Sequence, residues 1–200
     1  MILVAGLGNP GREYMDTRHN VGFLAVDEIS RRVGIELNKK KFHSSFGEGL
    51  FGGSRLLLIK PDTYMNRSGE AVASVRQFYN LPAENILVVY DEMDLPLGTV
   101  KIKPGGGSAG HKGIKSIISR TGSSDFVRIR IGIGKPRSGK GGANHVLSEF
   151  SKSEQQEIDE SIERASDAVL EIIESGPQNA MNKFNARPES NENKEENNSH

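Results

Sequence analysis

Apolar residues along the chain follow two spacings, which together predict strands interleaved with amphipathic helices. Continuous apolar runs at residues 2–5 and 86–90 are typical of strands that are buried on both faces. Residues 21–33 instead carry apolar side chains at helical spacing. Asn20 is a candidate N-cap of this helix, and Gly34 is a candidate for the residue just past its end.

The remaining elements alternate in the same way. We expect further strands at residues 46–51, 55–60, 99–103 and 126–131, and further helices at 68–80, 111–120, 151–174 and 177–184. Ser151 and Glu154 have the spacing of a capping box, which predicts where the long helix begins. Residues 134–144 are rich in glycine and lysine and are expected to form a loop.

This alternation predicts the α/β class. We expect a single domain over residues 1–185, built on a twisted, mostly parallel (mixed) sheet with helices on both faces. Residues 186–200 are expected to form a disordered polar, acidic tail, because residues 191–200 contain no apolar side chain.

Composition excludes several classes of protein. The 200 residues include no cysteine, so a disulfide framework, a thiol nucleophile and a cysteine-based zinc site are ruled out. No apolar run approaches the roughly 20 residues that a membrane-spanning helix needs. The first residues lead directly into a strand, without a basic segment or a cleavage signal, and we therefore expect a cytoplasmic protein.

The formal net charge of zero conceals an uneven distribution of charge. Residues 151–200 carry 5 Lys or Arg and 12 Asp or Glu, whereas residues 1–150 carry 21 and 14. In the window 99–145, ten basic residues stand against Asp125 alone. This basic window favours a polyanionic partner such as nucleic acid over a solvated surface that is merely offset by the acidic helix.

Polar side chains that can do chemistry follow the ends of three predicted strands. Asn9 and His19 follow the first strand, Asn66 follows a later one, and Asp91 follows the next. Parallel strands in one sheet would bring these residues to the same edge, where α/β proteins build their sites. The sequence therefore predicts a site at this edge, provided that the strands are parallel.

His19 and Asp91 suit a base and the carboxylate that orients it. Imidazole titrates near neutral pH, and a carboxylate on its other nitrogen fixes the tautomer and stabilises the imidazolium. No serine lies in a Gly-x-Ser-x-Gly turn, so the pair indicates activation of water rather than a covalent nucleophile. The amide of Asn66 could donate to an oxyanion that develops in the reaction.

Simpler interpretations of these residues stay open. A loop histidine is commonly a surface residue, an aspartate after a strand is commonly a turn or cap residue, and Asn66 could cap a helix. Tyr14 and Tyr64 could be ordinary half-buried aromatic residues. The five histidines lack the spacing of a metal site.

A second hypothesis rests on Gly6-x-Gly8-x-x-Gly11, which matches the dinucleotide-binding fingerprint. That fingerprint needs a helix to begin at the third glycine, so that the helix N-terminus binds the pyrophosphate. Here the helical pattern begins only near Val21, and the acidic residue expected at the end of a second strand is missing. The fit is incomplete, and no cofactor is expected.

Several longer motifs resemble those of the bacterial peptidyl-tRNA hydrolases, in the same order over residues 1 to about 185. They are Gly6-Leu-Gly-Asn-Pro-Gly11, Tyr14-x-x-Thr-Arg-His-Asn20, Lys60-Pro-x-Thr-Tyr-Met-Asn66-x-Ser-Gly69, Asp91-Glu-x-Asp-Leu-Pro96, Gly105-Gly-Gly, Gly110-His-x-Gly-Ile-Lys-Ser116 and Arg128-Ile-Arg-Ile-Gly-Ile-Gly134. The resemblance implies an enzyme that cleaves the ester between a peptide and the terminal ribose of a tRNA, which returns the tRNA to translation. It also implies a cytoplasmic monomer that works without a metal or cofactor.

The resemblance further implies roles for individual residues. His19 is the base that activates water, and Asp91 stabilises the form of His19 that accepts the proton. Asn9 binds the peptide backbone of an N-blocked substrate, and Asn66 binds near the scissile ester. Substrate or tRNA contacts are implied for Tyr14, Tyr64, Met65, Asn66, Lys101, Lys103, Gly107, His111, Lys112, Arg128 and Arg130.

One position departs from the family's pattern, because Lys112 follows the motif histidine where the family commonly has asparagine. Lysine only donates hydrogen bonds and carries a charge, so Lys112 could meet a phosphate. Phosphate contacts without base readout would suit an enzyme that has to accept every tRNA. A rival on the same fold is a non-catalytic RNA-binding protein, which would not need Asn9, His19, Asn66 and Asp91 together.

Overall fold

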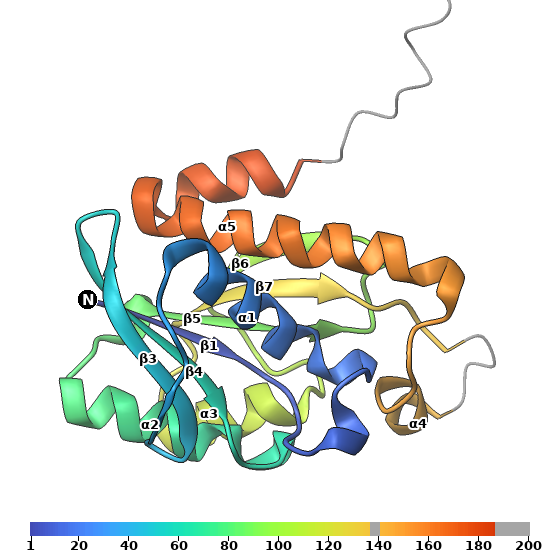
Figure 1. The fold of residues 1–200 in the computed structure, drawn as a ribbon, viewed down its shortest axis with the longest axis horizontal. Coiled ribbons are helices and arrows are strands. Elements are labelled where there is room, and N and C mark those ends of the chain that lie inside the picture. The colour runs from blue at the N-terminus through green and yellow to red at the C-terminus, as the bar shows by residue number, and fades with distance from the viewer. Residues whose placement is uncertain (137–140, 187–200) are drawn as a thin grey trace, which may run out of the picture.

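The computed structural model describes residues 1–136 and 141–186, which form a seven-stranded mixed sheet between two layers of helices (Figure 1). The strand order is β2-β3-β4-β1-β5-β7-β6. Four central strands are parallel, namely β4 (Ser54–Pro61), β1 (Ile2–Gly6), β5 (Ile86–Glu92) and β7 (Val127–Gly132). The antiparallel strands are β2 (Lys39–Lys41), β3 (Ser44–Phe51) and β6 (Val100–Pro104). The predicted fold class is confirmed.

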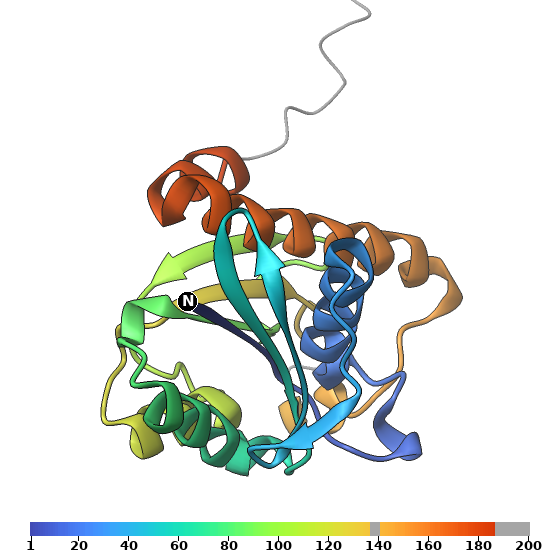
Figure 2. The ribbon, with the colours of Figure 1, turned by 60° about the vertical axis from the view of Figure 1, so that its left-hand side comes forward.

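Helices bury both faces of this sheet (Figure 2). One face is covered by α1 (Val21–Val33) and α5 (Lys152–Phe184), and the other by α2 (Ser68–Tyr79) and α3 (Lys112–Thr121). Successive side chains of a strand point to opposite faces, so Val4 packs in the first core and Leu3 in the second. Every residue of β5 is buried, which explains its continuous apolar sequence.

Two elements have no apolar pattern and were not predicted. β2 consists of three exposed lysines, and α4 (Gly142–Val146) is a short helix without a buried residue that begins within the expected glycine-rich loop and ends two residues past it. The predicted break near residue 176 is a kink inside α5, where Gly176 adopts a φ of 84° before Pro177. The capping box at Ser151 is present.

Some expectations fall on residues that the structure does not describe. Residues 137–140 of the expected loop and 187–200 of the expected tail lie outside the described residues. Among the helices of the described residues, none combines the length and the apolar character that crossing a membrane requires.

The glycines of the N-terminal motif serve close packing between α1 and the sheet. A Cβ on Gly22 would lie 2.4 Å from the carbonyl oxygen of Val89 and 2.6 Å from the backbone N and O of Leu7. A Cβ on Gly6 would lie 2.2 Å from the carbonyl oxygen of Gly22. Gly11 is followed by a 3₁₀ turn, and α1 begins only at Val21, so the helix start that the dinucleotide fingerprint requires is not built here.

We predict that Gly22→Ala lowers the free energy of unfolding by about 3 kcal/mol, because the added methyl group meets backbone atoms that cannot move aside. Gly107→Ala is the control, since a Cβ there would have no heavy atom within 4 Å, and its effect should stay within about 0.5 kcal/mol. Urea denaturation of both variants measures the difference. Equal stability of the two variants would contradict the close approach at Gly22.

Candidate functional site

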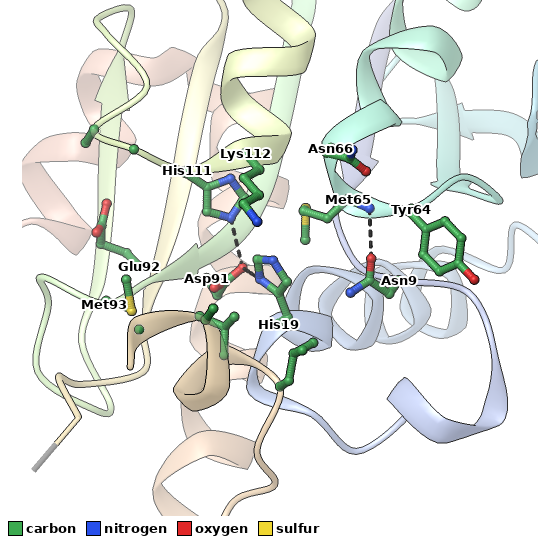
Figure 3. A pocket seen from close by; sticks show the side chains of 16 residues that line it. Asn9, His19, Tyr64, Met65, Asn66, Asp91, Glu92, Met93, His111 and Lys112 are labelled. Atoms are coloured by element: carbon green, nitrogen blue, oxygen red, sulfur yellow. Dashed lines mark hydrogen bonds and ion pairs between the residues drawn. The ribbon is translucent and has the colours of Figure 1, made fainter. Parts of the chain in front are cut away.

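The carboxyl ends of β4, β1 and β5 meet at one cavity of about 480 Å³ (Figure 3). β1 is parallel to both of its neighbours, which is the condition under which the sequence predicted a site at this edge of the sheet. Asn9 follows β1, His19 lies in the 3₁₀ turn Arg18–Asn20, and Asp91 lies within β5. Asn66 comes from the 3₁₀ turn after β4, and all four side chains line the cavity.

Two histidines share one oxygen of the buried carboxylate of Asp91. The Oδ1 atom of Asp91 lies 2.7 Å from Nδ1 of His19 and 3.0 Å from Nε2 of His111. The rings of the two histidines contact each other edge to face, with centroids 5.4 Å apart. Because Nδ1 of His19 faces the carboxylate, Nε2 is the ring nitrogen left for the cavity.

The surroundings of His111 fix its tautomer. Its Nδ1 accepts the backbone N–H of Ile114 at 3.3 Å, which makes His111 the N-cap of α3. The proton of a neutral His111 therefore sits on Nε2 and is donated to Asp91. The ring of Tyr90 packs against the imidazole, with centroids 4.8 Å apart.

Asp91 remains ionised in this environment. Burial by itself would raise the pKa of its carboxyl group, but the charge and hydrogen bonds of His111 and the hydrogen bond of His19 outweigh burial and lower the pKa from 3.8 to about 2. An ionised Asp91 accepts from both imidazoles, and the bond to Nδ1 of His19 favours the tautomer whose Nε2 is unprotonated.

Three hydrogen bonds fix Asn9 and leave the NH₂ group of its side chain without a partner among the described residues. Its Oδ1 accepts the backbone N–H of Met65 at 2.8 Å. Its own backbone N and O are bonded by the side chain of Asn20, at 2.8 and 3.0 Å. Asn20 occupies the predicted N-cap position of α1, but its side chain makes no capping hydrogen bond to the helix because it bonds Asn9 instead. The Nδ2 group of Asn9 is thereby the donor that remains for a ligand.

Apolar and aromatic groups complete the cavity. Tyr64 is 56% exposed at its rim and contacts Tyr14 edge to face, with ring centroids 6.4 Å apart. The cavity is also lined by the α4 wall, which consists of Gly142, Ala143, Val146 and Leu147. The sequence pattern does not predict this wall or Met93, because neither belongs to a periodic apolar segment.

The basic residues expected to contact RNA fall into two groups. Lys112 lines the cavity, and Lys103 lies against the glycine loop after β6; within the described residues neither forms a salt bridge. Arg130 is instead paired with Glu92 at 2.8 Å, and Lys101 donates to the backbone oxygen of Asn185. The second group is therefore engaged within the protein.

Arg128 requires a correction. The family resemblance implied a substrate or tRNA contact for Arg128, as for Arg130, but its side chain is buried, with 2% of the residue exposed. Its guanidinium donates to the backbone oxygens of Gly106 and Gly107. Arg128 thus holds the glycine loop from below and is not available for a phosphate. Burial lowers the pKa of its guanidinium.

His19, Asp91 and His111 are also the described residues that come closest to a metal-binding set. Their possible ligand atoms lie within 4.8 Å of one another. Those atoms already satisfy each other by hydrogen bonds, and the Ile114 N–H bond places a proton on the His111 nitrogen that an ion would need. Hydrogen bonding accounts for the geometry of this cluster.

Comparison with known proteins identifies similar chains over nearly the whole length. A family model described as peptidyl-tRNA hydrolase matches residues 3–195. A peptidyl-tRNA hydrolase from Thermoanaerobacter sp. (strain X514) is 51% identical, over 92% of this chain and 100% of that protein. One from Bacillus pumilus (strain SAFR-032) is 45% identical, over 94% of this chain and 100% of that protein. The crystal structure of a peptidyl-tRNA hydrolase from Acinetobacter baumannii superposes with a TM-score of 0.88 at 40% identity, over 93% of this chain and 95% of that one.

We predict that Arg128→Lys lowers the free energy of unfolding by about 2–3 kcal/mol, because lysine cannot reproduce a buried fork bonded to two carbonyl groups. Arg55→Lys, at an exposed arginine paired with Glu48, is the matched control and should change stability by less than about 0.5 kcal/mol. Denaturant titration compares the two. An Arg128→Lys protein as stable as the control would contradict this structural role, and Arg128 would again be a candidate for contact with RNA.

Proposed function

The chain belongs to the peptidyl-tRNA hydrolase family, and from that premise we propose that His19 activates the water that cleaves its substrate. It is an ester hydrolase that acts on peptidyl-tRNA. The observation that carries the proposal is the 2.7 Å bond from Nδ1 of His19 to Asp91, which leaves Nε2 as a base inside the cavity.

The proposed reaction needs no covalent intermediate with the protein. Nε2 of His19 takes a proton from water as the water oxygen attacks the ester carbonyl carbon. The side-chain amide of Asn66 donates to the oxyanion that forms. The imidazolium, stabilised by Asp91, then gives its proton to the departing ribose oxygen, so that the products are a peptide acid and a tRNA with a free ribose hydroxyl.

Asn9 supports selection of substrates whose amino group is blocked. Its Oδ1 is occupied by Met65, so only Nδ2 is free, and a free Nδ2 can donate to a carbonyl oxygen of the peptide. The charged amine of a free aminoacyl-tRNA offers no such acceptor. A donor held in a fixed position can therefore distinguish an N-blocked substrate from a free aminoacyl-tRNA, which lacks that one amide group.

The tRNA end would lie along basic and aromatic groups, some of which line the cavity while others lie outside it. We assign phosphate contacts to Lys103, Lys112 and the Gly107 backbone, and base or ribose contacts to Tyr14, Tyr64 and Met65, with His111 at the border of the site. Arg130 and Lys101 would have to leave their present partners to take part. Such binding tolerates sequence and weakens as salt is raised. We further propose that the protein acts as a monomer in the cytoplasm.

We predict that His19→Asn lowers kcat for N-acetylaminoacyl-tRNA by about 10²–10⁴-fold, the range for loss of a general base. His43→Asn is the matched control: His43 does not line the cavity, and asparagine tolerates its left-handed backbone (φ 55°). Release of the blocked amino acid is followed for both variants. Equal rates for His19→Asn and wild type would remove His19 from the mechanism and would favour a purely RNA-binding role.

We predict that Asn9→Asp shifts selectivity away from blocked substrates by about tenfold or more, the effect expected when one buried donor is lost. Aspartate keeps the oxygen that accepts from Met65 but replaces the free donor by an acceptor. The ratio of kcat/KM for N-acetylaminoacyl-tRNA to that for free aminoacyl-tRNA measures the shift. An unchanged ratio would show that Asn9 does not read the blocked amine.

A further inference from the structure

A buried arginine beside the proposed base faces away from the substrate cavity. Arg18 precedes His19 in the same 3₁₀ turn and is 7% exposed. It does not line the substrate cavity but a second cavity of about 430 Å³, together with Phe150 and Glu154. The proposed reaction gives this residue no role.

The guanidinium of Arg18 contacts three segments that are distant in sequence. Nη2 donates to Oε2 of Glu154 on α5 at 2.7 Å, and Nη1 donates to the backbone oxygen of Ile133, just after β7, at 3.3 Å. Nε donates to Oγ of Ser148 at 3.3 Å, and the ring centre of Phe150 lies 4.5 Å from the guanidinium carbon. Each direction of the planar fork is used, which lysine could not achieve.

Backbone hydrogen bonds also join the turn that carries Arg18 to the segment around Ser148. The N–H of Arg18 donates to the backbone oxygen of Ser148 at 2.9 Å, and Thr17 forms an antiparallel bridge with Glu149. Ser148 directly follows Leu147 of the α4 wall, so the segment that carries His19 and the α4 wall are held together at this point. Figure 1 shows α4 and the start of α5 beside the loop that follows β1. Because α4 has no buried residue, the wall depends on such anchors.

Glu154 links this junction to the beginning of α5. The carboxylate that binds Arg18 also accepts the N–H of Ser151 at 2.8 Å, as part of the capping box. Burial would raise the pKa of Glu154, but the hydrogen bonds from Arg18 and Ser151 outweigh it and lower the pKa from 4.5 to about 2. The ion pair is therefore charged at neutral pH.

We propose that Arg18, held by Glu154, is a positioning residue that fixes the imidazole of His19 and the α4 wall relative to each other. The proposal rests on the proposed role of His19 as the base. A base has to lie within hydrogen-bond reach of its water, and a displacement of about 1 Å can cost about 10²-fold in rate. In this role Arg18 controls the distance between the imidazole of His19 and its water, and it does not contact the substrate itself.

The test compares two arginines that both join the N-terminal half of the chain to α5. The inner pair is Arg18 and Glu154: Arg18→Lys removes the forked guanidinium, and Glu154→Gln removes the negative charge. Arg32→Lys and Asp167→Asn do the same to an outer pair, whose Nη1 and Oδ1 atoms are 2.6 Å apart and which lines neither cavity. We expect kcat to fall about 10- to 100-fold for the inner variants, with KM within about threefold of wild type. The outer variants should keep wild-type kcat.

Measurements at several temperatures below each melting point separate positioning from loss of stability. Rates are normalised to the folded fraction from circular dichroism, and a positioning effect persists where the variant is fully folded. Ser148→Ala removes a single acceptor of Arg18, should fold normally, and is expected to lower kcat about two- to fivefold, as one weak hydrogen bond predicts. Wild-type kcat in the inner variants, a loss that vanishes on cooling, or a raised KM with unchanged kcat would each overturn the proposal.

The same assay tells the two proposals apart. An inactive wild type, or a His19→Asn protein as active as wild type, would refute the proposed function itself. An active wild type and an impaired His19→Asn protein, together with inner variants at the wild-type rate, would refute only the role of Arg18.

Discussion

The buried carboxylate of Asp91 is the group on which the site depends. It lies near the end of β5, a strand that is buried along its whole length, and it accepts hydrogen bonds from two imidazoles at 2.7 and 3.0 Å. An ionised group at this depth is stable only because both donors satisfy it. The same requirement fixes the tautomers of His19 and His111, so the cost of burying a charge is what orders both imidazoles.

The three parallel strands β4, β1 and β5 supply the geometry that brings these groups together. Each strand contributes one side chain to the cavity: Asn9 follows β1, Asn66 follows β4, and Asp91 lies near the end of β5. Gly22 lets α1 approach the sheet directly behind them, and this close approach leaves the preceding 3₁₀ turn with His19 at the cavity. The close packing of α1 against the sheet thus also determines where His19 lies in the cavity.

Arginine in this protein serves structure more than direct binding. Arg128 supports the glycine loop from inside, Arg130 pairs with Glu92, and Arg18 joins three segments behind His19. Lys103 and Lys112 stay free of salt bridges among the described residues. This division follows from their chemistry, because the rigid fork of arginine can satisfy several fixed acceptors, whereas the flexible ammonium of lysine suits a mobile phosphate.

Sequence by itself determined the fold class, nearly all strands and helices, and the meeting of Asn9, His19, Asn66 and Asp91 at the cavity. Those predictions succeed because they rest on local periodicity and on the rule that parallel strands share a carboxyl edge. Tertiary structure alone decided how each polar side chain is used. Arg128 and Arg130 look equivalent in a strand of alternating residues, yet Arg128 is buried beneath the glycine loop and the partly exposed Arg130 is paired with the buried Glu92. Asn20 has the sequence context of a cap but orients Asn9, and β2 and α4 have no periodic signal at all. Hydrogen-bond partners far apart in the chain are chosen by packing, and a linear pattern contains no record of that choice.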